Sequence, residues 1–266
     1  SSNLTRNNST QTYTGTRHMS EISIYQIDAF SNKVFSGNPA AVCVLDHAIS
    51  DVLMQQIAKE NNLSETAFIV PNEAGWDIRW FTPKLEVPLC GHATLASAHV
   101  IFNERSFSGT EVKFQSKSGE WTVHQSGDLL TLDFPAMQYA DCDELPDALK
   151  DGLGIPPTSV FRVDSDPNYY AVYETEEQIL ALKPQLANLE QLHPYGVVIT
   201  APGRHHDCVS RYFLPSFNIP EDPVTGSIHC ALVPYWSNRL NKQKINAAQL
   251  SENGGELFCE VKGDRV

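Results

Sequence analysis

Two stretches of the sequence, RWFTPKLEVPLCGHATLASAHVIF at residues 79–102 and RYFLPSFNIPEDPVTGSIHCALVPYW at residues 211–236, follow one plan. Each begins with Arg, an aromatic residue, Phe, a variable residue and Pro, and the two Arg residues lie 132 positions apart in a chain of 266. After a polar turn, each enters a run of small and apolar residues that begins at Gly91 or Gly226. Self-similarity at half the chain length indicates a duplicated fold.

The segments 91–102 and 226–236 are small or apolar on nearly every face, so each predicts a helix buried on all sides. Short apolar stretches bounded by Pro, Gly and Ser predict many strands around them. A short helix is expected at residues 50–62, with Ser50 as its N-cap, and another near residues 175–192. The sequence therefore predicts an α+β protein of two pseudo-symmetric halves, each a curved sheet or barrel around a central helix. The expected strands are at residues 22–30, 40–45, 65–70, 77–81, 111–115, 121–125, 129–135, 160–164, 169–174, 195–200, 208–213 and 256–261.

The predicted organisation has three parts. Residues 1–18 are polar and without a core-forming pattern, which is typical of a tag or a disordered segment. The N-terminal half is expected at residues 19–128 and the C-terminal half at residues 129–266. Because the sequence stops soon after the apolar stretch 256–261, we expect a truncated C-terminus, with the last strand possibly returning to the first half.

Composition excludes several classes of protein. The 19 basic and 32 acidic residues give a net charge of −13, whereas nucleic-acid binding needs a basic surface. The sequence contains no apolar run of the roughly 18 residues that a membrane-spanning helix requires. The six cysteines show no CxxC spacing, which favours reduced thiols in a cytoplasmic protein.

The helix starts predict a site for an anion. In EDPVTGS, residues 221–227, two acids precede a turn that leaves backbone N–H groups at the start of a helix. Such N–H groups receive carboxylates and phosphates. If the two halves face each other, both helix starts point into one cleft, and we expect a small carboxylate substrate there.

Glu65, Cys90, His92 and Asp222 are the candidates for chemistry near these helix starts. A carboxyl group buried beside a His and a second acid suits the abstraction and return of a proton. A thiol at a helix N-terminus is favoured as a thiolate. Each residue also has a structural interpretation: Glu65 as a solvated turn residue, His92 as a buried structural imidazole, Cys90 as a small hydrophobic residue, and Asp222 as an ordinary helix-start acid.

A metal site is not expected. His205, His206 and Cys208 lie close in sequence, but the side chains of neighbouring residues on a strand point to opposite faces of the sheet.

Four motifs together resemble the phenazine-biosynthesis isomerase (PhzF-like) family. They are GNPAAV at residues 37–42, LSETAFIV at 63–70, CGHAT at 90–94 and EDPVTGS at 221–227. The resemblance runs from about Ile22 to Val266. It implies the diaminopimelate epimerase-like fold, with two similar halves and an active site in the cleft between them.

The resemblance also implies a chemistry, a cofactor-free isomerisation by proton transfer, best known on dihydro-hydroxyanthranilate. Glu65 corresponds to the residue that takes a proton from one carbon and returns it to another. His92 and Asp222 would orient the substrate and assist the transfer. The backbone N–H groups of Gly91, Gly226 and Ser227 would bind the substrate carboxylate. Homodimerisation is expected from the resemblance alone.

The sequence departs from the related epimerases at one catalytic position. Cys90 stands where these enzymes keep one of two catalytic cysteines, whereas the second position is Thr225. A mechanism with two thiols is therefore excluded, and we place Cys90 and Thr225 among the substrate-binding residues. Two alternatives to the isomerase stay open: an amino-acid racemase or epimerase that uses Glu65 and Cys90, and a non-catalytic protein that binds a small molecule or a partner.

Overall fold

A computed structural model describes residues 9–15, 18–105 and 107–266 of the chain. The chain divides into two compact units, Ser1–Asp133 and Phe134–Val266. The first unit is built on a nine-stranded sheet and the second on an eight-stranded sheet, with few helices in either. Among the described residues, no helix combines the length and the apolar character that crossing a membrane requires.

The sheet of the first unit has the strand order β1-β2-β3-β4-β5-β7-β8-β9, with β6 paired to β5. Strands β3 and β4 are parallel, as are β5 and β7, and the other neighbours are antiparallel. The elements are β1 Ser9–Gly15, β2 His18–Ala29, β3 Asn38–Val44, α1 Asp51–Asn61, β4 Glu65–Asn72, β5 Gly75–Phe81, β6 Glu86–Val87, α2 Gly91–Glu104, β7 Glu111–Ser116, β8 Gly119–Ser126 and β9 Leu129–Leu132.

The sheet of the second unit has the order β10-β11-β12-β13-β14-β16-β17, with β15 paired to β14. The elements are β10 Tyr139–Asp141, α3 Asp147–Leu153, β11 Ser159–Val163, β12 Asp166–Val172, α4 Glu176–Ala181, α5 Leu186–Leu189, a 3₁₀ turn Glu190–Leu192, β13 Gly196–Pro202, β14 Cys208–Leu214, a 3₁₀ turn Pro215–Phe217, β15 Ile219–Asp222, α6 Gly226–Leu240, β16 Lys244–Gln249 and β17 Gly255–Glu260.

The two units repeat one topology. Strand β5 pairs with an antiparallel predecessor, a short antiparallel strand β6 and a parallel strand β7, and β14 does the same with β13, β15 and β16. Both repeated Arg-aromatic-Phe units lie on these corresponding strands, at 79–81 and 211–213. The duplication predicted from the sequence is confirmed.

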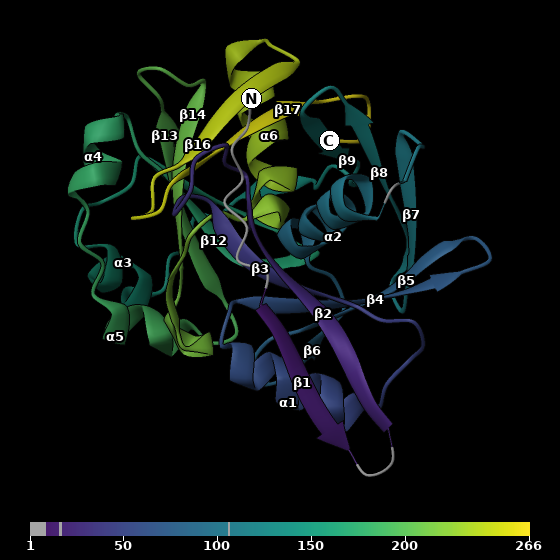
Figure 1. Ribbon diagram of the computed structural model, residues 1–266. Helices are drawn as coiled ribbons and strands as arrows, with labels where there is room; N and C mark the ends of the chain where they lie inside the picture. The colour runs from purple at the N-terminus through teal and green to yellow at the C-terminus, as the bar shows by residue number, and fades with distance from the viewer. Residues whose placement is uncertain (1–8, 16–17, 106) are drawn as a thin grey trace. The chain divides into compact units, whose positions relative to one another are not determined.

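Helix α2 is the centre of the first unit. It contacts β2, β3 and β4 near one end of the sheet and β8 and β9 at the other, so the sheet curves around it (Figure 1). In the second unit α6 contacts β16, the ring of its Tyr235 stacks on Phe161 of β11, and the indole of its Trp236 donates to the Thr200 hydroxyl of β13. A central helix therefore lies in each unit, as the apolar helix segments predict.

The faces of the first sheet follow the two-residue period of a strand. On β3, Ala40 and Val42 pack in the cluster around α2, while Ala41 and Cys43 pack with α1 on the opposite face. Helix α1 begins as predicted, because the Ser50 side chain accepts a hydrogen bond from the backbone N–H of Leu53.

Some expected elements differ in the structure. The helix expected near 175–192 is interrupted and forms α4, α5 and a 3₁₀ turn, because Pro184 lacks an N–H and cannot continue a helix. Strands β6, β10 and β15 have two to four residues, too few for a recognisable apolar alternation. Strand β16, KINAAQ, was also missed, because all its residues except Ile245 are polar or small.

The chain ends and the boundary also differ. Strand β1 pairs antiparallel with β2 along residues 9–15, as the edge strand of the first sheet. Residues 1–8 and 16–17 lie outside the described residues. The boundary between the units in the sequence follows Asp133 rather than residue 128, because β9 pairs with β8 and so belongs to the first unit. Strand β17 pairs with β16 in the second unit and ends at Glu260.

Gly37, at the turn into β3, has a backbone that only glycine tolerates. Its φ is +82°, and a Cβ atom there would lie 2.2 Å from the carbonyl oxygen of Ala29. We therefore expect Gly37→Ala to lower the free energy of unfolding by more than about 1 kcal/mol, measured by urea denaturation.

Gly127→Ala is the matched control. Gly127 also has a positive φ, +61°, but a Cβ there meets no atom within 4 Å. It should lose only the left-handed backbone strain of about 1 kcal/mol. Equal losses in the two variants would show that the close approach to Ala29 has no energetic weight.

Candidate active site

Three predicted site residues of the first unit lie together. Glu65 is the first residue of β4, Cys90 is the N-cap of α2, and His92 is the second residue of that helix. The His92 Nε2 lies 3.3 Å from Glu65 Oε2, and the His92 Nδ1 lies 3.3 Å from Cys90 Sγ. The imidazole therefore stands between a thiol and a carboxyl group, one at each ring nitrogen.

His92 is neutral at physiological pH. Burial lowers its pKa to about 4, and an interaction with the backbone carbonyl of Pro39 opposes this in part. A neutral imidazole carries one N–H and one acceptor nitrogen. His92 can therefore accept a proton at one nitrogen while releasing one at the other.

The same three residues are also of the types that bind metal ions, and they lie close together. One donor atom from each of Glu65, Cys90 and His92 lies within 4.8 Å of the others. A single metal ion, however, binds one imidazole nitrogen, and here the thiol and the carboxylate contact opposite nitrogens. This geometry, with a hydrogen bond at Nδ1 and a close polar contact at Nε2, favours two separate contacts of the imidazole over chelation.

The second unit holds a separate polar cluster. Asp222 ends β15, and the hydroxyl of Thr225, the N-cap of α6, donates to Asp222 Oδ2. The predicted substrate-binding residues Gly226 and Ser227 are the first two residues of α6. The Thr225 hydroxyl thus fixes the carboxylate of Asp222 from within the unit.

Gln249, the last residue of β16, is a site residue that sequence reasoning missed. Its amide nitrogen donates to the carbonyl of Asp222 at 2.9 Å and to the Thr225 hydroxyl at 3.2 Å. Its amide oxygen accepts from the backbone N–H of Thr225 at 2.8 Å. Gln249 is fully buried, and these three bonds hold the 222–225 turn. The only sign of this role in the sequence was a Gln at the end of a strand of mostly polar and small residues.

His229 is buried in the first turns of α6. Its Nδ1 lies 2.7 Å from the carbonyl oxygen of Thr225, which identifies Nδ1 as the protonated nitrogen. Burial lowers the pKa of His229 to about 4. His229 is therefore a second buried neutral imidazole, one in each unit.

An ion pair precedes each helix start. Arg79 of β5 makes two parallel bonds of 2.8 Å to Glu86 of β6, and Arg211 of β14 makes two of 2.8 and 2.9 Å to Glu221 of β15. Such bidentate pairs fix geometry as well as charge. We call these two pairs the Arg–Glu clamps. Glu221, which the sequence presents as a helix-start acid, is one half of a clamp.

Within the described part of the chain, the starts of α2 and α6 lack side-chain caps. Among the described residues, neither Cys90 nor Thr225 makes a side-chain cap hydrogen bond, and neither helix has an acidic residue in its first turn. The first N–H groups of a helix have no partner within the helix. Gly91 and Gly226 begin α2 and α6, which is the position the anion-binding prediction requires.

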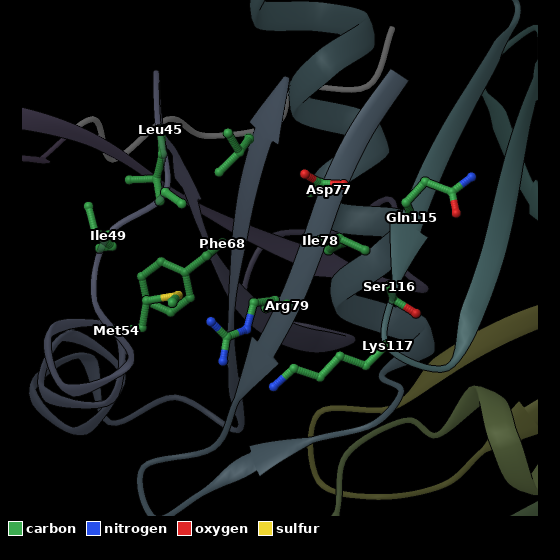
Figure 2. Close-up of a pocket in the computed structure, with 12 residues that line it drawn as sticks. Leu45, Ile49, Met54, Phe68, Asp77, Ile78, Arg79, Gln115, Ser116 and Lys117 are labelled. Carbon is green, nitrogen blue, oxygen red and sulfur yellow. The ribbon is translucent and has the colours of Figure 1, made fainter. Parts of the chain in front are cut away.

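A cavity of about 350 Å³ in the first unit lies elsewhere, on the face of the sheet that α1 covers. Figure 2 shows Met54 and Phe68 on one side and the cations Arg79 and Lys117 on another. Both cations are bound to Glu86, and Arg79 also to Asp51. None of the predicted site residues lines this cavity, and its paired cations give no reason to place the chemistry there.

Comparison with known proteins now decides the family. The model of the family described as phenazine biosynthesis-like protein matches residues 27–266. The chain belongs to the phenazine biosynthesis-like family. A protein of Pseudomonas aeruginosa named an uncharacterised isomerase is 47% identical over 246 residues, 92% of this chain and 93% of the relative. The chain is accordingly an enzyme of the isomerase class.

Solved structures confirm the fold. A crystal structure of a PhzF-family protein from Enterococcus faecalis has a TM-score of 0.87 at 42% identity, covering 92% of this chain and 93% of that one. A probable proline racemase from Agrobacterium radiobacter has a TM-score of 0.56 at 10% identity, covering 88% and 83%. The second likeness shows a shared fold alone. The predicted α+β class of two pseudo-symmetric halves is thereby confirmed.

The contribution of the Arg211–Glu221 clamp to the free energy of unfolding can be measured with a variant. Arg211 and Glu221 are largely buried, with side chains 16% and 24% exposed. We expect Glu221→Gln to lower the free energy of unfolding by about 1.5–3 kcal/mol, because charge-assisted hydrogen bonds are lost. Glu256→Gln is the control: its pair with His206 is exposed, so the loss should be below about 1 kcal/mol in urea denaturation.

The buried imidazoles predict a pH dependence of stability. Since the pKa of His229 falls from 6.5 to about 4 on folding, the unfolded chain binds more protons in this range. The contribution of neutral His229 to the free energy of unfolding is complete above pH 6.5 and declines as the pH falls toward 4. Between pH 7 and pH 5 it declines by roughly 2 kcal/mol.

The test measures the free energy of unfolding by urea denaturation, at about pH 7 and about pH 5, for wild type and for His229→Gln. The Gln side chain does not titrate. The decline in the free energy of unfolding should be smaller in His229→Gln. His47→Gln is the control, since His47 is exposed and its loss should leave the decline unchanged. A decline of equal size in His229→Gln and wild type would contradict the assignment of this pH dependence to His229.

Proposed function

We propose that the protein is a cofactor-independent isomerase that moves a proton within a small carboxylate-bearing substrate. Glu65 is the base that takes the proton from one carbon and returns it to another. The observation that carries the proposal is the contact of Glu65 with a buried neutral imidazole at 3.3 Å. Contacts of this kind are often long before a substrate binds.

The first unit supplies the proton chemistry. In the first step the C–H bond breaks, its proton forms an O–H bond with Glu65, and the electron pair stays on the substrate. In the second step the same O–H bond breaks and the proton forms a C–H bond at another carbon. Glu65 is only 18% exposed and lies beside an apolar cluster, which limits exchange of this proton with water.

The second unit supplies orientation. Asp222 is held by the Thr225 hydroxyl and, through its backbone, by Gln249, so its carboxylate is a fixed acceptor for a polar group of the substrate. The N–H groups at the start of α6, at Gly226 and Ser227, are donors for the substrate carboxylate, and Gly91 offers the same in the first unit.

The racemase alternative is less well supported. Two opposing bases must lie on opposite faces of one carbon, each about 3–3.5 Å from it, and so about 6–7 Å apart. Donor atoms of Glu65 and Cys90 lie within 4.8 Å of each other and contact the same imidazole. This arrangement suits one base with an imidazole and a thiol beside it on the same side.

The decisive experiment measures incorporation of solvent deuterium and formation of product by mass spectrometry and NMR. The substrates are dihydro-hydroxyanthranilate, diaminopimelate, proline and hydroxyproline. We expect turnover of a member of this panel by wild type and a loss of about 10²–10⁴-fold in Glu65→Gln, because a positioned general base contributes this much. Product must be measured with label, since a shielded Glu65 returns the proton it took.

Glu60→Gln is the matched control, since Glu60 is exposed on α1 and should leave turnover unchanged. Full turnover by Glu65→Gln would remove Glu65 as the base. Binding of a panel member by wild type without label or product would favour the non-catalytic alternative.

A further inference from the structure

We propose that Cys90 is a positioning residue that acts through His92: its thiol donates a hydrogen bond to Nδ1 and thereby fixes the tautomer whose Nε2–H faces Glu65. The inference deepens the proposed function and rests on Glu65 as the base. It assigns to Cys90 a task other than that of a base or of a substrate ligand.

The contacts leave two ways to place the protons. His92 Nδ1 faces Cys90 Sγ at 3.3 Å and Nε2 faces Glu65 Oε2 at 3.3 Å. A neutral imidazole carries a single N–H, so either a thiol donates to Nδ1 while Nε2–H faces a carboxylate, or a carboxylic acid donates to Nε2 while Nδ1–H faces a thiolate. The two arrangements hold the same number of protons. They differ in whether one proton is on the sulfur or on Nδ1, and whether the other is on Nε2 or on the carboxyl oxygen.

The relative acidity of a carboxyl group and a thiol decides between these two arrangements. An ordinary carboxyl group ionises about four pKa units below an ordinary thiol, and a carboxylate so close to the thiol opposes a second negative charge, so the thiol and carboxylate form is favoured. The N–H that each tautomer carries is set by the bond made at the other nitrogen. Cys90 therefore places the N–H at Nε2, where Glu65 is.

The fold orients the Cys90 side chain for this task. Cys90 has an extended backbone, with φ −145° and ψ 108°, and makes no side-chain cap hydrogen bond to α2. Its carbonyl accepts from the Thr94 hydroxyl at 2.6 Å and the Thr94 N–H at 3.1 Å, which fixes its backbone. The residue is 7% exposed and packs in the apolar cluster around α2. In the described part of the chain, the polar groups facing His92 are Glu65 from β4, Cys90 at the start of α2 and the Pro39 carbonyl from β3, which can only accept a hydrogen bond from the ring.

Loss of the thiol has a defined consequence. In Cys90→Ala, Nδ1 loses its donor, so the fraction of His92 with Nδ1–H rises, opposed by the Glu65 carboxylate at Nε2. Nε2 then presents a lone pair to the Glu65 carboxylate, which disfavours the ionised form that must take the substrate proton. We expect kcat to fall about five- to tenfold with little change in KM, the effect of one ordinary hydrogen bond, and the acidic limb of the pH–rate profile to move to higher pH.

The first measurement needs no substrate. The imidazole ¹⁵N resonances of the ¹⁵N-His-labelled enzyme report which nitrogen of each His is protonated, and His92→Asn identifies the signals of His92. We expect wild type to show a protonated Nε2 and an unprotonated Nδ1, Cys90→Ser to keep this pattern, and Cys90→Ala to shift toward the other tautomer. Cys43→Ala, which removes a buried thiol on β3, should leave His92 unchanged.

The outcomes separate the two proposals. A wild-type His92 protonated at Nδ1, or His92 resonances unchanged in Cys90→Ala, overturns the positioning role. The resonances of the other His residues show whether each variant is folded, and Cys90→Ser supplies a second variant if Cys90→Ala is not. The expected tautomer pattern together with full turnover by Glu65→Gln would keep Cys90 as the residue that sets the tautomer and refute Glu65 as the base.

Discussion

The Arg–Glu clamps hold the geometry on which the rest of each unit depends. The short strands β6 and β15 make few backbone pairs, so a sheet ladder alone fixes their position poorly. The bidentate bonds from Arg79 to Glu86 and from Arg211 to Glu221 lock each short strand onto the strand beside it. Each Arg also stacks over the Phe two residues later, which explains why Arg, aromatic and Phe recur together.

The clamp then determines where a helix begins. A short turn leads from Glu86 to Gly91 and another from Glu221 to Gly226, and most residues of the helix that follows are buried. Such a helix cannot slide without opening cavities, because protein interiors are closely packed. The polar residues at the helix starts are therefore held by two rigid elements, a clamped strand and a packed helix.

One framework carries different chemistry in the two units. In the first, an imidazole separates a thiol from a carboxyl group, a set that can exchange protons. In the second, Asp222, Thr225 and Gln249 bond to one another, a set that holds its shape. The first set suits proton transfer, and the second suits a fixed polar acceptor.

The sequence by itself determined the α+β class, the duplication, the buried helices and the candidates Glu65, His92 and Asp222, because these follow from local periodicity and from motifs within short stretches. It could not show that Glu221 belongs to a clamp, that Gln249 ties the turn at Asp222, or that Cys90 faces one nitrogen of His92. The contacts of Glu221 and Gln249 join residues 10 to 27 positions apart. Cys90 and His92 are only two residues apart, yet their contact depends on the extended backbone of Cys90. Only the tertiary structure decided them, because strand pairing and helix packing choose which distant side chains meet.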